Sequence, residues 1–146
     1  KDLISKISVH FKVEKQNSIY KPTCRHEFSV YLENEWYKLN LKSQEVAVSN
    51  PVEGLDSSIL TRYILTPILG ISDLKTNSRI SFLGGLKGME GLQKEVDKDR
   101  AKIAFGLYPV GVEQLKTIAD TGNIMPPKTT WIEPKLRSGL TIFELK

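Results

Sequence analysis

Cations and hydroxyl groups are concentrated in one short stretch near the end of the chain. Residues 125–139, MPPKTTWIEPKLRSG, hold three prolines, three cations and three hydroxyl side chains. Lysine and arginine bind phosphate and carboxylate groups, and a segment stiffened by proline loses less entropy when it binds a ligand. This composition indicates an anion-binding site. Its candidate ligand-binding residues are Lys128, Thr129, Lys135, Arg137 and Ser138.

The same stretch also has a structural interpretation. Its prolines exclude a helix, while Trp131, Ile132 and Leu136 are too apolar for a disordered linker. In this interpretation the prolines set the path of a strap, Trp131 fills a gap in the core, and the cations are simply solvated. The sequence alone leaves both interpretations open.

Asp120 is a sixth candidate ligand-binding residue. It falls in the last turn of an expected helix, where the helix macrodipole disfavours a negative charge. This mismatch predicts a partner for Asp120, such as Lys128 or Arg137. The alternative to a plain salt bridge is a role in which Asp120 and Ser138 orient a ligand.

The rest of the chain offers few groups for chemistry. Cys24 is the only cysteine, which excludes an internal disulfide and favours a cytoplasmic, reducing compartment. On a strand, Cys24 and His26 would share a face, the one arrangement that could activate the thiol. His10 and His26 lack metal-ligand spacing, so we predict no metal site, and the sequence identifies no cofactor.

A glycine-rich stretch is a further candidate. Residues 84–91, GGLKGMEG, could approach a phosphate with their backbone N–H groups. Their spacing matches neither the G-x-G-x-x-G motif nor the P-loop, which favours a plain tight turn.

Composition excludes several classes of partner. The chain has 146 residues and a net charge of +4, which fits one globular domain over residues 1–146. No apolar run approaches the roughly 20 residues that cross a bilayer, so we expect no membrane partner. The cations are spread along the chain, which makes nucleic acid an unlikely partner. Tyr31, Trp36 and Tyr37 could still form a stacking platform for bases if no second layer covers them. Nothing in the sequence indicates an oligomeric state.

The first half of the chain predicts a helix followed by strands. The helix is expected over residues 2–10 and a strand over 11–14. Residues 27–32 and 36–41 alternate apolar and polar side chains on either side of Glu33-Asn34. Because asparagine tolerates positive φ, this pattern predicts a β-hairpin.

The second half predicts alternating helices and strands. A helix should begin at Asp56 as its N-cap and end near Pro67. The further elements are a strand over 80–83, a helix over 89–96, a central apolar strand over 103–108, a helix over 112–119 closed by Gly122, and a strand over 140–145. The fold class is therefore α+β: a mixed sheet with an early antiparallel hairpin, later βαβ units, and helices packed on the sheet.

Several stretches together suggest a family. Residues 125–131 and 133–140 resemble the end of the prokaryotic family called domain of unknown function 1015. Residues 26–28, 36–39, 55–60, 67–71, 82–85 and 119–122 agree with it in order. The resemblance implies that the chain is the C-terminal part of a longer protein, two to three times its length as a rough estimate from domain sizes. The family's upstream Asp-Gly-His-His-Arg motif is absent here, and the family has no established activity to carry over.

These observations lead to three expectations of function. The first is an accessory domain that binds an anionic, phosphorylated small molecule through the rigid basic segment. The second is a structural or interaction module that docks an N-terminal domain, absent from this chain, or a second subunit. The third is weak binding of single-stranded nucleic acid. Whether the protein is an enzyme is left open, because any catalytic step would need the absent N-terminal part.

Overall fold

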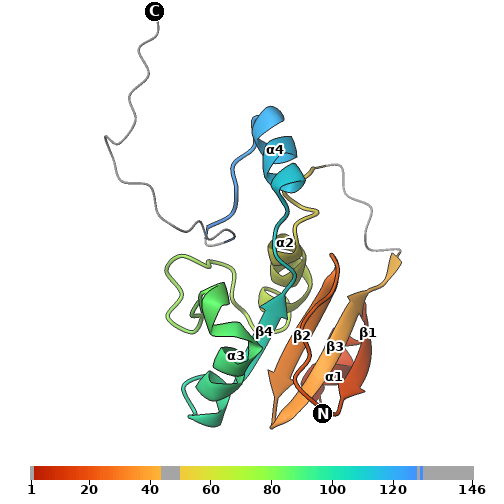
Figure 1. The fold of residues 1–146 in the computed structure, drawn as a ribbon, viewed down its shortest axis with the longest axis vertical. Helices are drawn as coiled ribbons and strands as arrows, with labels where there is room; N and C mark the ends of the chain where they lie inside the picture. Colours follow the sequence, from red (N-terminus) through yellow and green to blue (C-terminus); the bar gives the residue numbers. More distant parts are fainter. Residues whose placement is uncertain (1, 44–49, 128, 130–146) are drawn as a thin grey trace, which may run out of the picture.

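A computed structural model describes residues 2–43 and 50–127 together with Thr129 (Figure 1). Its centre is an antiparallel sheet with the strand order β1–β3–β2–β4. The strands are β1 (Phe11–Gln16), β2 (Glu27–Leu32), β3 (Glu35–Leu41) and β4 (Ile103–Leu107). The helices are α1 (Asp2–Ile7), α2 (Asp56–Leu60), α3 (Gly88–Asp97) and α4 (Val112–Asp120), with a π-helical turn η2 (Thr61–Leu65) after α2 and a 3₁₀ turn η3 (Gly85–Lys87) before α3. The predicted α+β class is confirmed.

The early hairpin is also confirmed. Strands β2 and β3 pair with Leu32 opposite Glu35, so that Glu33 and Asn34 alone form the turn. Both turn residues have positive φ, 51° and 62°, as a type I′ turn requires. The predicted strand that begins at Phe11 forms as β1 and pairs antiparallel with β3.

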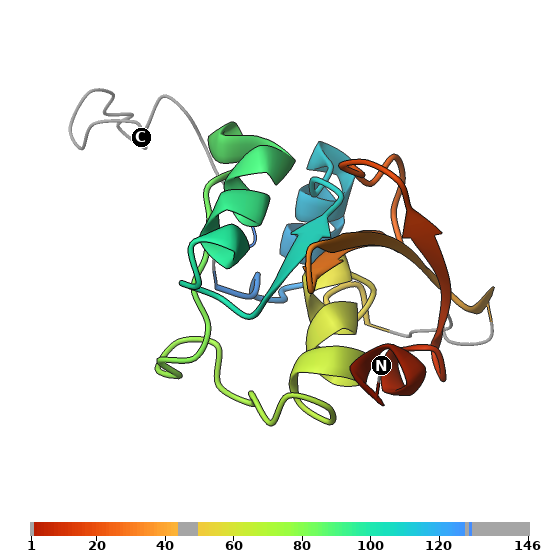
Figure 2. The same ribbon diagram turned by 90° about the horizontal axis from the view of Figure 1, so that it is seen from below.

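The larger core lies between the sheet and the helical segment α2–η2. Phe28, Val30 and Leu39 alternate to one face of the sheet, and their side chains are fully buried there. Figure 2 shows α2 and α3 on opposite sides of the sheet. The other buried members of this core are Ile7, Phe11, Leu41, Ile59, Leu60, Ile64, Leu65 and Ile71.

A smaller core lies on the opposite face, under α3. Tyr31 of β2 and Trp36 of β3 are nearly fully buried beside Ala104, with ring centroids 4.9 Å apart. The Tyr31 hydroxyl donates a hydrogen bond of 2.7 Å to Asp97 at the end of α3. The α3 side chains that cover these rings are Met89, Leu92 and Val96. A second layer thus covers two of the three rings that could have formed a stacking platform for bases, so the platform is not available.

Some predicted elements differ from the structure. Residues 80–83 form no strand, and all four described strands pair antiparallel, so the expected βαβ units are absent from the described part. Asp73 and Asn77 accept hydrogen bonds from backbone N–H groups two residues further on, at Lys75 and Arg79. These local turns precede residues 80–83 and compete with sheet pairing. Strand β4 stands last in the described order instead of in a central position. The predicted strand over 140–145 lies outside the described residues.

Two helix predictions need correction in detail. Asp56 is the first residue of α2 and not its N-cap, which is Leu55; its carboxylate instead accepts the His26 backbone N–H at 3.0 Å. Helix α4 forms as expected, and Gly122 follows it with a φ of 68°. Its expected buried face consists of the apolar residues Val112, Leu115, Ile118 and Ala119, but only Ile118 is buried, and Val112 is 77% exposed. Among the described residues, no helix combines the length and apolar character that a membrane span requires.

Candidate functional site

The structure describes two of the six predicted site residues. Thr129 donates its hydroxyl hydrogen bond to the Pro126 carbonyl, which closes a turn at the start of the basic segment. Asp120 lies at the end of α4 and forms an exposed ion pair with Lys116, with Nζ and Oδ2 3.5 Å apart. Asp120 thus has a partner as predicted, but this partner is Lys116 and not Lys128 or Arg137, the two that the sequence suggested. Lys128, Lys135, Arg137 and Ser138 lie outside the described residues.

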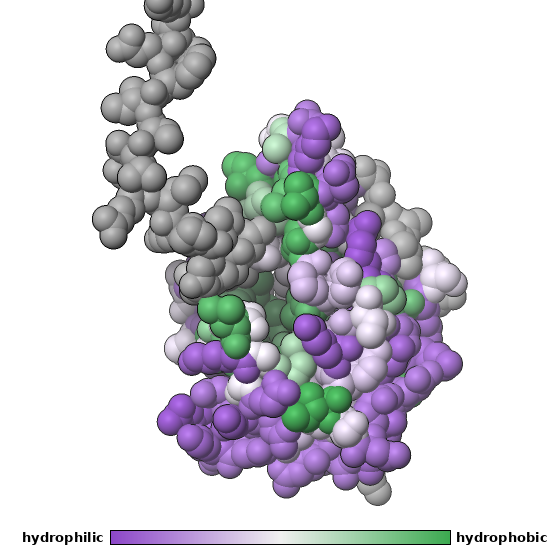
Figure 3. Space-filling view, viewed as in Figure 1, coloured by the Kyte–Doolittle hydropathy of each residue, from purple (hydrophilic) through white to green (hydrophobic). Residues whose placement is uncertain are grey.

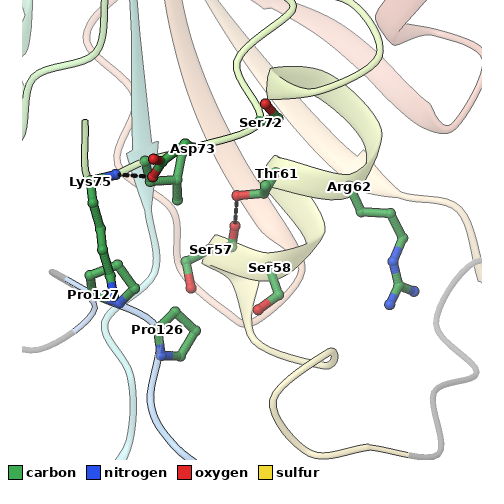
Figure 4. Close-up of a pocket in the computed structure, with 10 residues that line it drawn as sticks. Ser57, Ser58, Thr61, Arg62, Ser72, Asp73, Lys75, Pro126 and Pro127 are labelled. Carbon is green, nitrogen blue, oxygen red and sulfur yellow. Dashed lines mark hydrogen bonds between the residues drawn. The ribbon is translucent and has the colours of Figure 1, made fainter. Parts of the chain in front are cut away.

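A cavity of about 480 Å³ lies beside the first described residues of the proline-rich segment (Figure 4). Pro126 and Pro127 form one wall, the segment α2–η2 forms a second, and residues 72–75 form a third. Its polar lining consists of Ser57, Ser58, Thr61, Arg62, Ser72, Asp73 and Lys75, with Leu74 as the other apolar contribution. Two cations, four hydroxyls and two rigid prolines thus surround one space.

The second wall owes its shape to a change of helix type. After Leu60 the backbone widens, and the Thr66 N–H bonds to the Thr61 carbonyl at 3.0 Å, five residues back. A π-helical turn inserts an extra residue per turn and is frequent at functional sites. Thr61 and Arg62, the first two residues of this turn, both line the cavity. The underlying apolar residues Ile64 and Leu65 anchor the turn in the main core.

The charged groups of the cavity are held in different ways. The carboxylate of Asp73 accepts hydrogen bonds from the Thr76 hydroxyl and from the Lys75 N–H, and these bonds lower the pKa of Asp73. Arg62 pairs with Glu53, with Nη2 and Oε2 2.6 Å apart. Within the described part of the chain, the Lys75 ammonium has no carboxylate within ion-pair distance. Of the two cations that line the cavity, Lys75 is therefore more available to an incoming anion than Arg62, which is paired with Glu53.

The hydroxyls stand between the two cations. In Figure 4, Ser57 and Ser58 lie between Arg62 on one side and Lys75 with Pro127 on the other. Thr61 donates its hydroxyl hydrogen bond to the Ser57 carbonyl at 2.8 Å. The Ser57 hydroxyl is itself covered and has no hydrogen-bond partner among the described residues. A covered polar group without a partner carries an uncompensated desolvation cost.

A second polar cluster surrounds Glu27, which is only 2% exposed. Burial opposes its ionisation, but hydrogen bonds from Tyr20, Thr23 and Cys24 and the ion pair with Lys38 prevail, so the pKa of Glu27 is lowered. Because the Cys24 thiol donates to this carboxylate, the pKa of Cys24 is raised. Cys24 also lies before β2 and not on a strand, so the premise for a thiol activated by His26 is wrong.

Two further candidate features have a structural role in the described residues. His26 adopts a φ of 65°; its backbone N–H bonds to Asp56, and its carbonyl accepts the Leu41 N–H at 3.0 Å. The glycine-rich stretch forms η3 and a turn at Gly88, where φ is 62°. The Glu90 carboxylate lies directly beside Gly88 and would repel a phosphate there. No group of three histidine, cysteine, aspartate or glutamate side chains suited to a metal ion occurs in the described residues.

No family model matches this chain, and no curated protein or solved structure shows significant similarity to it. The resemblance to the family domain of unknown function 1015 stays a prediction. The segments that carry it include 26–28 and 36–39 on the hairpin and 55–60 at α2, whereas most of residues 125–140 lies outside the described part. The geometry of the site itself is therefore the basis for a functional proposal.

Proposed function

We propose that the cavity between α2–η2, residues 72–75 and Pro126-Pro127 binds a small anionic ligand, most favourably one that carries a phosphate group. The observation that supports this proposal is the placement of Lys75 and Arg62 on either side of the Ser57 and Ser58 hydroxyls. Cations supply charge and hydroxyls supply directed donors, the combination that phosphate recognition uses.

The position of the proline-rich segment adds support. Pro127 lines the cavity, and the next residue in the sequence is Lys128, the first of the predicted ligand-binding cations. Fixed proline φ angles hold this wall in place before a ligand arrives, which reduces the entropy lost on binding. In this proposal Lys75 and Arg62 share the recognition of the anion with the basic segment that begins at Lys128.

Substitution of Lys75 tests the proposal. We expect inorganic phosphate to shift the amide resonances of Ser57, Ser58 and Lys75 in an NMR titration. Lys75→Ala should weaken phosphate binding about threefold to tenfold, because one charge-assisted contact is lost.

Lys102→Ala is the matched control, because it also removes one positive charge, from a lysine that pairs with Asp99 at a distance from the cavity lining. If phosphate causes no shift of these amide resonances in the wild type, the cavity is not an anion site. An equal loss of affinity in Lys75→Ala and Lys102→Ala would also refute it.

A second candidate function is an interaction module, which the surface near α4 favours. Val112 is 77% exposed and Ile124 is 88% exposed, and Figure 3 shows hydrophobic patches at the base of α4 and beside it. Exposed apolar side chains that gather on one surface mark contacts with other proteins. If a second copy of the chain binds there, Val112→Glu should convert a dimer into a monomer in light-scattering measurements. A monomeric wild type at all concentrations would count against this function.

A further inference from the structure

The ion pair between Arg62 and Glu53 connects the cavity to a residue outside it. Arg62 lines the cavity, but Glu53 does not. Their Nη2 and Oε2 atoms are 2.6 Å apart, and the side chains are 37% and 48% exposed. Glu53 belongs to the turn before α2, where its N–H bonds to the Asn50 carbonyl at 3.0 Å. The carboxylate therefore holds the guanidinium from the side of the turn, next to the second wall of the cavity.

The contact with Glu53 leaves most donors of the guanidinium unused, while the guanidinium carbon also lies 5.9 Å from the centroid of the Tyr63 ring. An ion pair between exposed side chains is weak, because water screens both charges. One hydrogen bond to Glu53 uses one of the five N–H donors of Arg62. A phosphate group can take two parallel donors from an arginine and carries more charge than a carboxylate. A dianion in the cavity is thus a stronger partner for Arg62 than Glu53 is.

Glu53 also sets the charge that a ligand meets. Among the described residues, the cations Arg62 and Lys75 are balanced by the carboxylates Asp73 and Glu53, so these four groups carry no net charge together while all are ionised. Asp73 is held in its own turn by Thr76 and Lys75. Among the described residues, the Glu53 carboxylate contacts only the Arg62 side chain, so Glu53 is the carboxylate that a ligand would have to displace.

We infer that Glu53 is a specificity-determining residue of the site: it occupies Arg62 in the free protein, and only a ligand with a strongly anionic group releases Arg62 from it. This inference rests on the proposed function of the cavity. It predicts that weakly charged ligands bind poorly because they cannot compete for Arg62. It also predicts that neutralising Glu53 increases affinity for an anion, whereas a purely structural ion pair would have no such effect.

Phosphate titrations of Glu53→Gln test the inference. We expect the dissociation constant for inorganic phosphate to fall about twofold to fivefold, the range that the loss of an exposed competing ion pair allows. Glu95→Gln is the matched control, because Glu95 forms a similar exposed pair with Arg100, with Oε1 and Nη1 3.2 Å apart, on α3. This control should leave the dissociation constant unchanged. In an Arg62→Ala background, Glu53→Gln should have no effect, which gives a double-mutant cycle for the competition.

The outcomes separate the two proposals. If wild type binds phosphate, Lys75→Ala weakens it, and Glu53→Gln matches wild type, then the role of Glu53 is wrong and the cavity remains an anion site. Equal tightening by Glu53→Gln and Glu95→Gln would reduce the effect to net charge and also overturn the role of Glu53. If neither wild type nor Glu53→Gln binds phosphate, both proposals fail. Binding by Glu53→Gln alone would support the inference most directly.

Discussion

Two buried carboxylates, Glu27 and Asp56, differ in how their surroundings treat a negative charge. Glu27 has donors on several sides, so its pKa is lowered although burial opposes this. Burial dominates at Asp56, and the single bond from the His26 N–H does not offset it, so the pKa of Asp56 is raised. The ionised form of Glu27 therefore stabilises the fold, whereas the ionised form of Asp56 opposes it.

We predict opposite pH dependence for these two carboxylates. A lowered folded pKa means that Glu27 contributes stability above its unfolded pKa of about 4.3, and that this contribution is lost as the pH falls through the folded pKa. Glu27→Gln should thus lower the free energy of unfolding by about 1–3 kcal/mol at pH 7, through the loss of hydrogen bonds to a charged acceptor. The difference from wild type should shrink as the pH falls below 4, measured by urea unfolding.

Asp56→Asn provides the control with the opposite sign. A raised folded pKa means that Asp56 contributes stability below its unfolded pKa of about 3.9, which is lost as the pH rises through the folded pKa. Because asparagine keeps an acceptor for the His26 N–H, we expect Asp56→Asn to be at least as stable as wild type at pH 7. A larger loss of stability for Asp56→Asn than for Glu27→Gln at pH 7 would contradict this assignment.

At the scale of elements, the contact between α3 and the sheet depends on a close approach at Gly106. A Cβ atom on Gly106 would lie 2.3 Å from the Ser29 hydroxyl and 2.7 Å from the Met89 sulfur. The Ser29 hydroxyl itself contacts the Met89 sulfur at 3.4 Å. There is therefore no room for a side chain at residue 106, where β2, β4 and α3 meet.

We predict that Gly106→Ala destabilises the protein by about 1–3 kcal/mol, the usual cost of an overpacked core. Chemical denaturation would measure this change in the free energy of unfolding. Gly85→Ala is the matched control, because a Cβ atom on Gly85 meets nothing within 4 Å. Equal stability of Gly106→Ala and Gly85→Ala would show that α3 can move away from the sheet at no cost.

The elements that could be predicted are those fixed by neighbours in the sequence. The β2–β3 hairpin follows from alternating side chains and a two-residue turn, and α4 follows from its apolar spacing and Gly122. A single sequence does not show that β2 lies between β3 and β4, because this pairing joins residues more than 70 positions apart. The same limit applies to residues 80–83, which are apolar enough to be predicted as a strand but have no strand partner among the described residues.

At the scale of the whole molecule, the candidate site is assembled from three distant segments. The sequence identified the segment that begins at Pro126, because prolines and cations stand together there. Arg62 and Lys75 carry no such signal, since neither stands in a stretch of the sequence that combines prolines with cations. Only the fold places them beside Pro126 and Pro127, and the π-helical turn that presents Arg62 has no recognisable sequence pattern. The sequence could thus point to one wall of this cavity, but not to the residues that line the other two.

The strand order predicts how protection from hydrogen exchange is distributed over the molecule. Strands β2 and β3 each lie between two strands, whereas β1 and β4 each have one partner among the described residues. In an antiparallel pair, successive N–H groups point alternately toward the partner and away from it. We therefore expect slow exchange along β2 and β3, and an alternation of slow and fast amides along β4, measured by NMR in D₂O. Strand β1 is the other strand with one described partner, so its amides should show the same alternation and serve as an internal comparison.

Uniformly slow exchange at the amides of β4 would contradict an open edge there. It would show that another segment pairs with β4, as a central position of this strand in the sheet would require. The predicted strand over residues 140–145 would then be the first segment to test. Loss of the added protection after deletion of residues 140–146, with β2 and β3 unchanged, would assign it to that segment. Persistence of the protection after this deletion would exclude residues 140–146 as the partner, and its loss on dilution would assign it to a second molecule.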